Sequence, residues 1–175
     1  MLIKVEVTPR LVTGRRFSRL QGVKDASEPP LVSIAADGSR FLAFGGDALR
    51  VLASSGRDQV CANPFSDIET TMRDCRLAIA FMKWFFGERL TKGSLSPFPP
   101  QVVAQFTGYA RPFNEGERIV LKEILMHAGA AEVLLGQLEH SLSDLEAKQA
   151  FGLLRKSGVP DKKVVMPTTR VEKWG

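Results

Sequence analysis

Cysteine and histidine are scarce in this chain of 175 residues, which contains two of each. Two cysteines cannot hold a chain of this length together as a disulfide scaffold. Neither His127 nor His140 has a cysteine or a second histidine three or four residues away, as zinc sites usually do. We therefore expect Cys61 and Cys75 to be reduced thiols, and we expect no metal site.

Long apolar runs and export signals are also missing. The longest apolar run, Leu77 to Phe86, is interrupted by Lys83 and falls well short of the ~20 residues that a membrane-spanning helix needs. Met1 leads directly into an alternating apolar and polar segment, so we expect no secretory signal. These absences predict a cytoplasmic location.

The sequence motifs of familiar catalytic and phosphate-binding loops are absent as well. The chain has no Gly-x-Ser-x-Gly elbow, no Walker loop and no dinucleotide-binding fingerprint. Gly45-Gly46 precedes a predicted helix, and a helix start can hold an anion. We favour a plain strand-to-helix turn at this position, and we expect no catalytic residues in the chain.

The composition that remains is that of a soluble globular protein, with 44% hydrophobic and 25% charged residues in a length that fits one domain. The net charge of +5 is unevenly placed, because residues 1–24 and 155–175 are basic and residues 25–154 are acidic overall. Basic ends attract nucleic acid or anionic membranes. The basic patch that we predict for an anionic partner consists of Arg10, Arg15, Arg16, Arg19 and Lys24.

The first half of the chain predicts strands and one long helix. Residues 2–7 alternate as a half-buried strand does, whereas the basic stretch that follows has no clear pattern. Asp37-Gly38 is a hairpin turn signal between strands 31–35 and 41–44, and a short helix follows over 47–53. Ser66 and Glu69 form a predicted capping box for a helix that runs to about Phe86, with Gly87 as its C-cap.

The second half predicts alternating strands and helices. Residues 101–107 and 132–135 indicate strands, and the helix between them is capped by Asn114, with Glu117 at its third position, and ends at Gly129. Ser143 and Glu146 form another capping box. A strand–helix–strand order implies a parallel pair, so the fold class is α/β. We expect one domain over residues 1–160 and a basic tail over 161–175.

Residues 28–150 resemble the first domain of the MreB/Mbl-type bacterial actins. Residues 127–135 (His-Ala-Gly-Ala-Ala-Glu-Val-Leu-Leu) are close to the Ala-Gly-Ala-Arg-Glu-Val-Tyr-Leu-Ile of that family. Residues 42–48 resemble its Ala-Val-Gly-x-x-Ala turn, and residues 28–34 its Asn-Glu-Pro-Ser-Val-Val-Ala strand. The resemblance implies a single actin-like, ribonuclease-H-like domain with a mixed sheet and flanking helices.

The departures from the family concern its nucleotide site. The resemblance implies that two domains grip ATP with glycine-rich loops, yet residues 6–10 (Glu-Val-Thr-Pro-Arg) stand where the first loop reads Asp-Leu-Gly-Thr. The glycine is absent there, and Pro9 removes an amide donor. The degenerate nucleotide-binding positions are Glu6, Thr8, Glu117 (the family's water-activating acid) and Gln137 (within its Glu-Glu-Pro). With the second domain also lacking, we expect no ATPase activity and no bound ATP or Mg²⁺.

Three functions are compatible with these observations. The first is a non-catalytic, MreB-like scaffold or interaction protein linked to cell shape or to a membrane-associated assembly, which binds a protein partner or associates with itself as a dimer or larger. The second is a nucleotide-binding regulator that caps or copolymerises with a full-length bacterial actin. The third is a basic-ended protein that binds an anionic membrane or nucleic acid; lipid at the inner face of the membrane fits the resemblance better.

Overall fold

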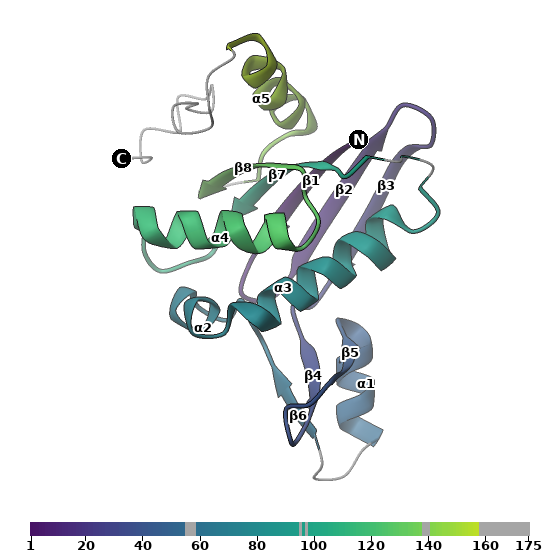
Figure 1. Cartoon of the computed structure of the whole chain (residues 1–175), viewed down its shortest axis with the longest axis vertical. Helices are drawn as coiled ribbons and strands as arrows, with labels where there is room; N and C mark the ends of the chain where they lie inside the picture. Colours follow the sequence, from purple (N-terminus) through teal and green to yellow (C-terminus); the bar gives the residue numbers. More distant parts are fainter. Residues whose placement is uncertain (55–58, 95, 97, 138–140, 158–175) are drawn as a thin grey trace.

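The computed structural model of the protein describes residues 1–54, 59–94, 96, 98–137 and 141–157. Its main element is a five-stranded mixed sheet with the strand order β3-β2-β1-β7-β8 (Figure 1). The first three strands are antiparallel, whereas β7 is parallel to both β1 and β8. The strands are β1 (Leu2–Val7), β2 (Val12–Ser18), β3 (Gly22–Glu28), β7 (Gln101–Phe106) and β8 (Glu132–Gln137).

Helices lie on both faces of this sheet. On one face, α3 (Cys75–Trp84) and α4 (Glu115–His127) cover β1, where Ile3, Val5 and Val7 are fully buried. Because side chains alternate along a strand, Lys4 and Glu6 point to the opposite face. The helix α5 (Asp144–Ser157) contacts β1 from that side. The predicted strand over residues 2–7 and the predicted parallel pair are confirmed.

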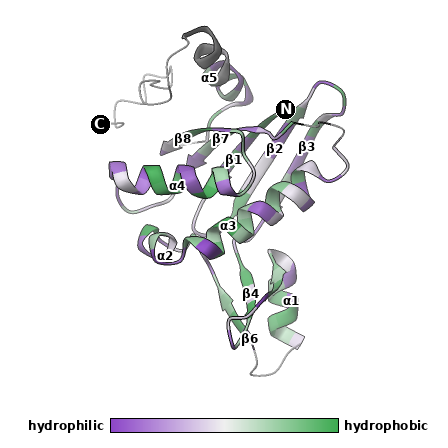
Figure 2. Cartoon of the chain, viewed as in Figure 1, coloured by the Kyte–Doolittle hydropathy of each residue, from purple (hydrophilic) through white to green (hydrophobic). Residues whose placement is uncertain are grey.

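A second, smaller sheet projects from the end of the first (Figure 1). It has the order β5-β4-β6, with strands β4 (Val32–Ala35), β5 (Phe41–Phe44) and β6 (Gln59–Ala62), and it packs against α1 (Gly46–Ser54). The predicted hairpin is confirmed, since the Gly38 N–H donates to the Ala35 carbonyl at 2.8 Å and Gly38 has a φ of 70°. Figure 2 shows that β4 and α1 are largely hydrophobic.

The long helix expected from Ser66 to Phe86 is instead three elements. They are α2 (Ile68–Arg73), α3 and the π-helical η1 (Phe85–Thr91). The cap is Asp67, which accepts a hydrogen bond from the Thr70 N–H at 2.6 Å, so the predicted capping role of Ser66 is wrong. The helix breaks at Asp74, whose backbone angles (φ −134°, ψ 71°) are not helical. Short polar side chains such as aspartate favour such breaks because they compete with the helical backbone.

Gly87 does not end the helix, contrary to prediction, because η1 continues through it to Thr91. The continuation lets Leu90 reach the sheet, where it is fully buried. A Cβ built on Gly14 of β2 would lie 2.7 Å from the Leu90 side chain and 2.8 Å from the Phe85 ring, so the glycine leaves room for these two side chains of η1. Packing against the sheet therefore decides where the helix ends.

The predicted caps of the second half are confirmed. Asn114 and Glu117 form a reciprocal capping box at the start of α4. Ser143 and Glu146 do the same before α5, with the Glu146 N–H donating to Ser143 Oγ at 3.2 Å. The predicted tail, residues 161–175, lies outside the described residues. No helix in the described part of the chain has both the length and the apolar character that a bilayer crossing requires.

Candidate functional site

The residues predicted for a nucleotide site lie near the carboxyl ends of β1, β7 and β8. In sheets with parallel strands, ligands usually bind at this edge. Thr8 follows β1, Gln137 ends β8, and Glu117 stands in the first turn of the helix that follows β7. These positions share an edge of the sheet, where Thr8 and Glu6 belong to separate hydrogen-bonded groups and Glu117 and Gln137 both bond to Arg111.

The turn between β1 and β2 is closed on itself. The Thr8 N–H donates to the Leu11 carbonyl at 2.9 Å. The Thr8 hydroxyl also donates to that carbonyl, at 2.8 Å, and accepts from the N–H groups of Arg10 and Leu11 at 3.2 and 2.8 Å. Pro9 has no N–H, and its carbonyl accepts from Asn63 Nδ2 at 2.7 Å. Every amide of the turn that could hold an anion is already bonded within the turn.

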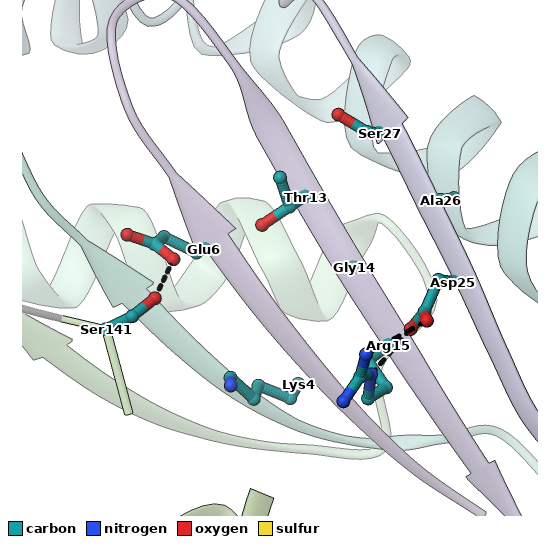
Figure 3. A pocket seen from close by; sticks show the side chains of 9 residues that line it. All are labelled: Lys4, Glu6, Thr13, Gly14, Arg15, Asp25, Ala26, Ser27 and Ser141. Carbon is teal, nitrogen blue, oxygen red and sulfur yellow. Dashed lines mark hydrogen bonds and ion pairs between the residues drawn. The ribbon is translucent and has the colours of Figure 1, made fainter. Parts of the chain in front are cut away.

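Glu6, at the end of β1, is held by two hydroxyl groups. Thr107 Oγ1 donates to one carboxylate oxygen at 3.0 Å, and Ser141 Oγ donates to the other. Thr107 follows β7 and Ser141 precedes α5, so the carboxylate links two segments that are far apart in the sequence. Figure 3 shows Glu6 and Ser141 pointing toward one another.

Glu117 is engaged by three donors. Arg111 binds both carboxylate oxygens, at 2.9 and 2.6 Å, and the Asn114 N–H donates to Oε2 at 2.8 Å. The Arg111 guanidinium, helped by the Asn114 amide and opposed by burial, holds the pKa of Glu117 below its ordinary value. Glu117 is thus both the N3 residue of the α4 capping box and the ion-pair partner of Arg111.

Gln137 ties β8 to the segment that precedes α4. Its Oε1 accepts from the Phe113 N–H at 2.6 Å, and its Nε2 donates to the Arg111 carbonyl at 2.7 Å. Gln137 and Glu117 are thus brought together through Arg111. The roles of Arg111, Thr107 and Ser141 were not predicted, because nothing in their local sequence indicates contacts with residues elsewhere in the chain.

An open groove of about 510 Å³ lies beside Glu6 on the sheet face that α5 partly covers (Figure 3). Cross-strand neighbours form two rows in it, Glu6–Thr13–Ser27 and Lys4–Arg15–Asp25. Arg15 binds Asp25 at 2.6 and 3.0 Å and Asp144 at 2.6 Å, and these bonds raise its pKa further. The guanidinium is therefore already neutralised by carboxylates of its own chain.

The structure separates the five residues predicted as a basic patch. Arg10 lies in the β1–β2 turn, whereas Arg19 and Lys24 lie at the other end of β2, and Arg15 faces the groove. Arg16 points to the helix-covered face, where it is only 5% exposed and its Nε has no hydrogen-bond partner. The five side chains do not share one surface.

The histidines and cysteines were the remaining candidates for metal or thiol chemistry. No group of three or more metal-ligating side chains occurs among the residues that the structure describes. His127 is exposed in the last turn of α4, 3.9 Å from Glu123, and His140 lies outside the described residues. Cys61 and Cys75 are both free thiols, as predicted.

No protein-family model and no curated protein sequence matches the chain. Solved structures do. MreB5 of Spiroplasma citri bound to ADP has a TM-score of 0.55 at 20% identity, covering 78% of this chain and 37% of that one. The same protein bound to AMPPNP has a TM-score of 0.51 at 17% identity, and the match covers 91% of this chain and 41% of that one. A non-polymerising MamK mutant bound to AMPPNP has a TM-score of 0.54 at 12% identity, and the match covers 78% of this chain and 40% of the MamK chain.

The chain therefore spans about two fifths of the length of each of these structures. Identities this low establish a shared fold and leave function open. The mixed sheet, its flanking helices and these neighbours confirm the predicted fold class. The protein is an α/β domain with an actin-like fold.

Proposed function

We propose that this protein is a non-catalytic, actin-like scaffold or interaction protein. The observation that carries the proposal is the closed turn after β1, in which the N–H groups of Thr8, Arg10 and Leu11 are all bonded internally and Pro9 has none. Nucleotide phosphates in glycine-rich loops are held by free backbone amides. A turn without free amides supports the loss of nucleotide binding, and with it the loss of ATP hydrolysis.

The two carboxylates of the site support the same proposal. A residue that coordinates a metal or activates water needs a free oxygen lone pair directed at the substrate. Glu6 receives a hydroxyl group on each oxygen, and Glu117 receives Arg111 on both oxygens. A metal ion or an attacking water would therefore have to displace these donors or share the carboxylate with them.

The biological role that we propose is assembly: a dimer or larger complex, or a complex with another protein, linked to cell shape or to a membrane-associated structure. The actin-like fold supports this role, because one neighbour is described as a non-polymerising mutant, so polymerisation is a property of the parent MamK protein. In this proposal the actin-like fold serves to present binding surfaces to other proteins, and it does not serve to bind a nucleotide.

Calorimetric titration of the protein with ATP and magnesium tests the loss of nucleotide binding. We expect no heat and no change in melting temperature at millimolar nucleotide. A dissociation constant in the micromolar range would overturn the proposal in favour of a nucleotide-binding regulator of a full-length actin. The variant Glu6→Ala is the control, since binding at this edge would weaken when Glu6 is removed.

A second candidate function is attachment to an anionic membrane. The observation that favours it is the β2–β3 turn, where Leu20 is 83% exposed next to the exposed Arg19. Val23 is 59% exposed nearby, so apolar and basic side chains share this tip. An apolar side chain flanked by positive charge suits an anionic lipid surface.

Co-sedimentation with vesicles tests this candidate. We expect binding to vesicles of phosphatidylcholine with phosphatidylglycerol, no binding to phosphatidylcholine alone, and a loss of binding in Arg19→Glu. The exposed Arg73→Glu on α2 is a charge-matched control. Equal binding by both variants would rule out this tip as the attachment site.

A further inference from the structure

The outer edge of β3 is free. β3 is the last strand of the five-stranded sheet on its side, and no other described strand pairs with its second edge. Apart from the ladder with β2, no hydrogen bond to the backbone of residues 23–27 occurs between described residues. A free edge presents a row of backbone donors and acceptors to another strand.

Two cations beside this edge lack a counter-ion. Arg16 of β2 lies directly opposite Lys24 of β3, so both side chains are on the same face of the sheet. Arg16 is 5% exposed, its Nε has no hydrogen-bond partner, and neither residue forms an ion pair within the described part of the chain. Like charges directly opposite one another are destabilising, and burial increases the cost. A carboxylate that arrived at the edge beside Lys24 would relieve this repulsion.

The neighbours of Lys24 in the strand define what else an added strand would meet. Val23 is 59% exposed and Asp25 is exposed, and both lie on the face of the groove because side chains alternate along a strand. Both carboxylate oxygens of Asp25 are already bound by Arg15, so Asp25 asks for no charge in a partner. The unsatisfied positions of the edge are therefore the cation Lys24 and the exposed apolar Val23.

We propose that the free edge of β3 binds an extended acidic segment of a partner protein, which adds to the sheet as a further strand antiparallel to β3. An acidic side chain of the segment lies opposite Lys24, on the face that carries Arg16. The next residue of the segment lies opposite Val23 and is apolar. The backbone ladder supplies affinity, and the two side-chain positions supply specificity. This inference rests on the binding of a protein partner in the proposed function and names the surface and the chemistry of that partner.

A peptide accounts for more of this edge than a free anion does. Phosphate or a lipid headgroup would neutralise Lys24 but would leave the backbone donors and acceptors of β3 unpaired by protein. A lysine at a free edge also disfavours basic strands and admits a strand whose carboxylate faces it. Antiparallel addition is the orientation that we propose because antiparallel pairs are slightly more stable per residue than parallel ones.

Calorimetric titration with a synthetic peptide tests the site on the unaltered protein. The peptide Thr-Ser-Thr-Ser-Glu-Val-Thr, acetylated and amidated so that Glu is its one charged group, places Glu opposite Lys24 and Val opposite Val23. We expect saturable binding. The matched peptide with Gln in place of Glu should bind at least about tenfold more weakly, because it lacks the charge that Lys24 and Arg16 attract.

Backbone methylation of the peptide tests strand addition itself. Along an edge strand the amides of successive residues point alternately toward the neighbouring strand and away from it. Methylating the amide nitrogen of either Glu or Val should therefore abolish binding in one case and be tolerated in the other. Equal binding by the two methylated peptides would overturn strand addition, since plain charge attraction does not distinguish the two amides.

Variants of the protein identify Lys24 as the recognising residue. Lys24→Glu should weaken binding of the Glu peptide at least about tenfold and should bind the matched peptide with Lys in place of Glu more tightly than the parent does. It should melt no lower than the parent, since it places a carboxylate opposite Arg16. Arg73→Glu makes the same charge change at an exposed position of α2 and should leave peptide binding unchanged.

The possible failures are distinguishable. No saturable binding of the Glu peptide at protein concentrations up to about 1 mM would overturn the β3 site and leave the proposed function standing through other surfaces. Micromolar binding of ATP would overturn the proposed function without touching the peptide site. Vesicle binding that Lys24→Glu abolishes, together with no peptide binding, would replace the peptide by an anionic lipid.

Discussion

The Gly46 N–H donates to Glu28 Oε2 at 3.0 Å, so helix α1 begins on a carboxylate supplied by the last residue of β3. The other oxygen of Glu28 binds Arg89 of η1 at 2.5 Å. Glu28 is 8% exposed and stands where the chain passes from the large sheet to the small one. The helix start at Gly45-Gly46 therefore does hold an anion, and that anion is the Glu28 carboxylate of the protein itself. Glu28 thereby connects the large sheet to the helix that packs against the small sheet.

Removing this carboxylate should destabilise the fold. Glu28→Ala leaves the Gly46 N–H and the Arg89 guanidinium without their shared acceptor, so we expect a loss of about 2–3 kcal/mol in the free energy of unfolding. Glu28→Gln keeps an acceptor and should lose about half as much. Urea unfolding measures both variants. The control is Glu88→Ala, which breaks only the exposed ion pair with Lys92 and should change stability by less than about 0.5 kcal/mol.

The Glu117 cap should contribute stability only above its titration range. Because the pKa of Glu117 is lower in the folded protein than in the unfolded chain, its contribution is present above the unfolded pKa, about 4.3, and is lost as the pH falls through the folded value. We expect Glu117→Gln to cost about 1 kcal/mol at pH 7 and progressively less below pH 4. Urea unfolding across this pH range checks the sign. A cost that grows on acidification would contradict the assigned role.

Two glycines should respond oppositely to alanine. At Gly14 the added methyl group would press on Leu90 and Phe85, so Gly14→Ala should destabilise the protein by about 1–3 kcal/mol. At Gly87 nothing lies within 4 Å and the backbone is helical, so Gly87→Ala should be neutral or stabilise by up to about 1 kcal/mol. Thermal unfolding distinguishes them. A destabilising Gly87→Ala would instead support the C-cap predicted from the sequence.

The docking of α5 should depend on salt. Asp144 at its start binds Arg15 at 2.6 Å and Lys4 at 3.5 Å, and Lys148 lies 4.6 Å from the centre of the Phe17 ring. Partly exposed charge pairs are screened by salt. We therefore expect amide exchange in α5 to speed up in 1 M NaCl and in Asp144→Asn at low salt, as followed by mass spectrometry. Asp47→Asn, which breaks an exposed pair in α1, should leave exchange in α5 unchanged.

Local patterns predicted much of the fold. The Asn114 and Ser143 caps, the Asp37-Gly38 turn and the alternation in residues 2–7 all depend on residues within a few positions of one another. The strands β2 and β3 were not predicted. Their alternation is obscured because Gly14 and Arg16 occupy buried positions of β2 where apolar side chains would be expected. Their strand structure depends on pairing with β1 and on the approach of η1.

The sequence by itself determined the class of the fold, the Asn114 and Ser143 caps, the Asp37-Gly38 turn and the missing amide donor at Pro9, because each depends on the residue, its nearest neighbours or the order of the elements. Only the tertiary structure decided what each site residue does. Glu6 meets Ser141 across 135 positions, and Gly46 meets Glu28 across 18. A hydrogen bond forms only where packing brings donor and acceptor within about 3 Å, and no local pattern encodes which distant groups will meet.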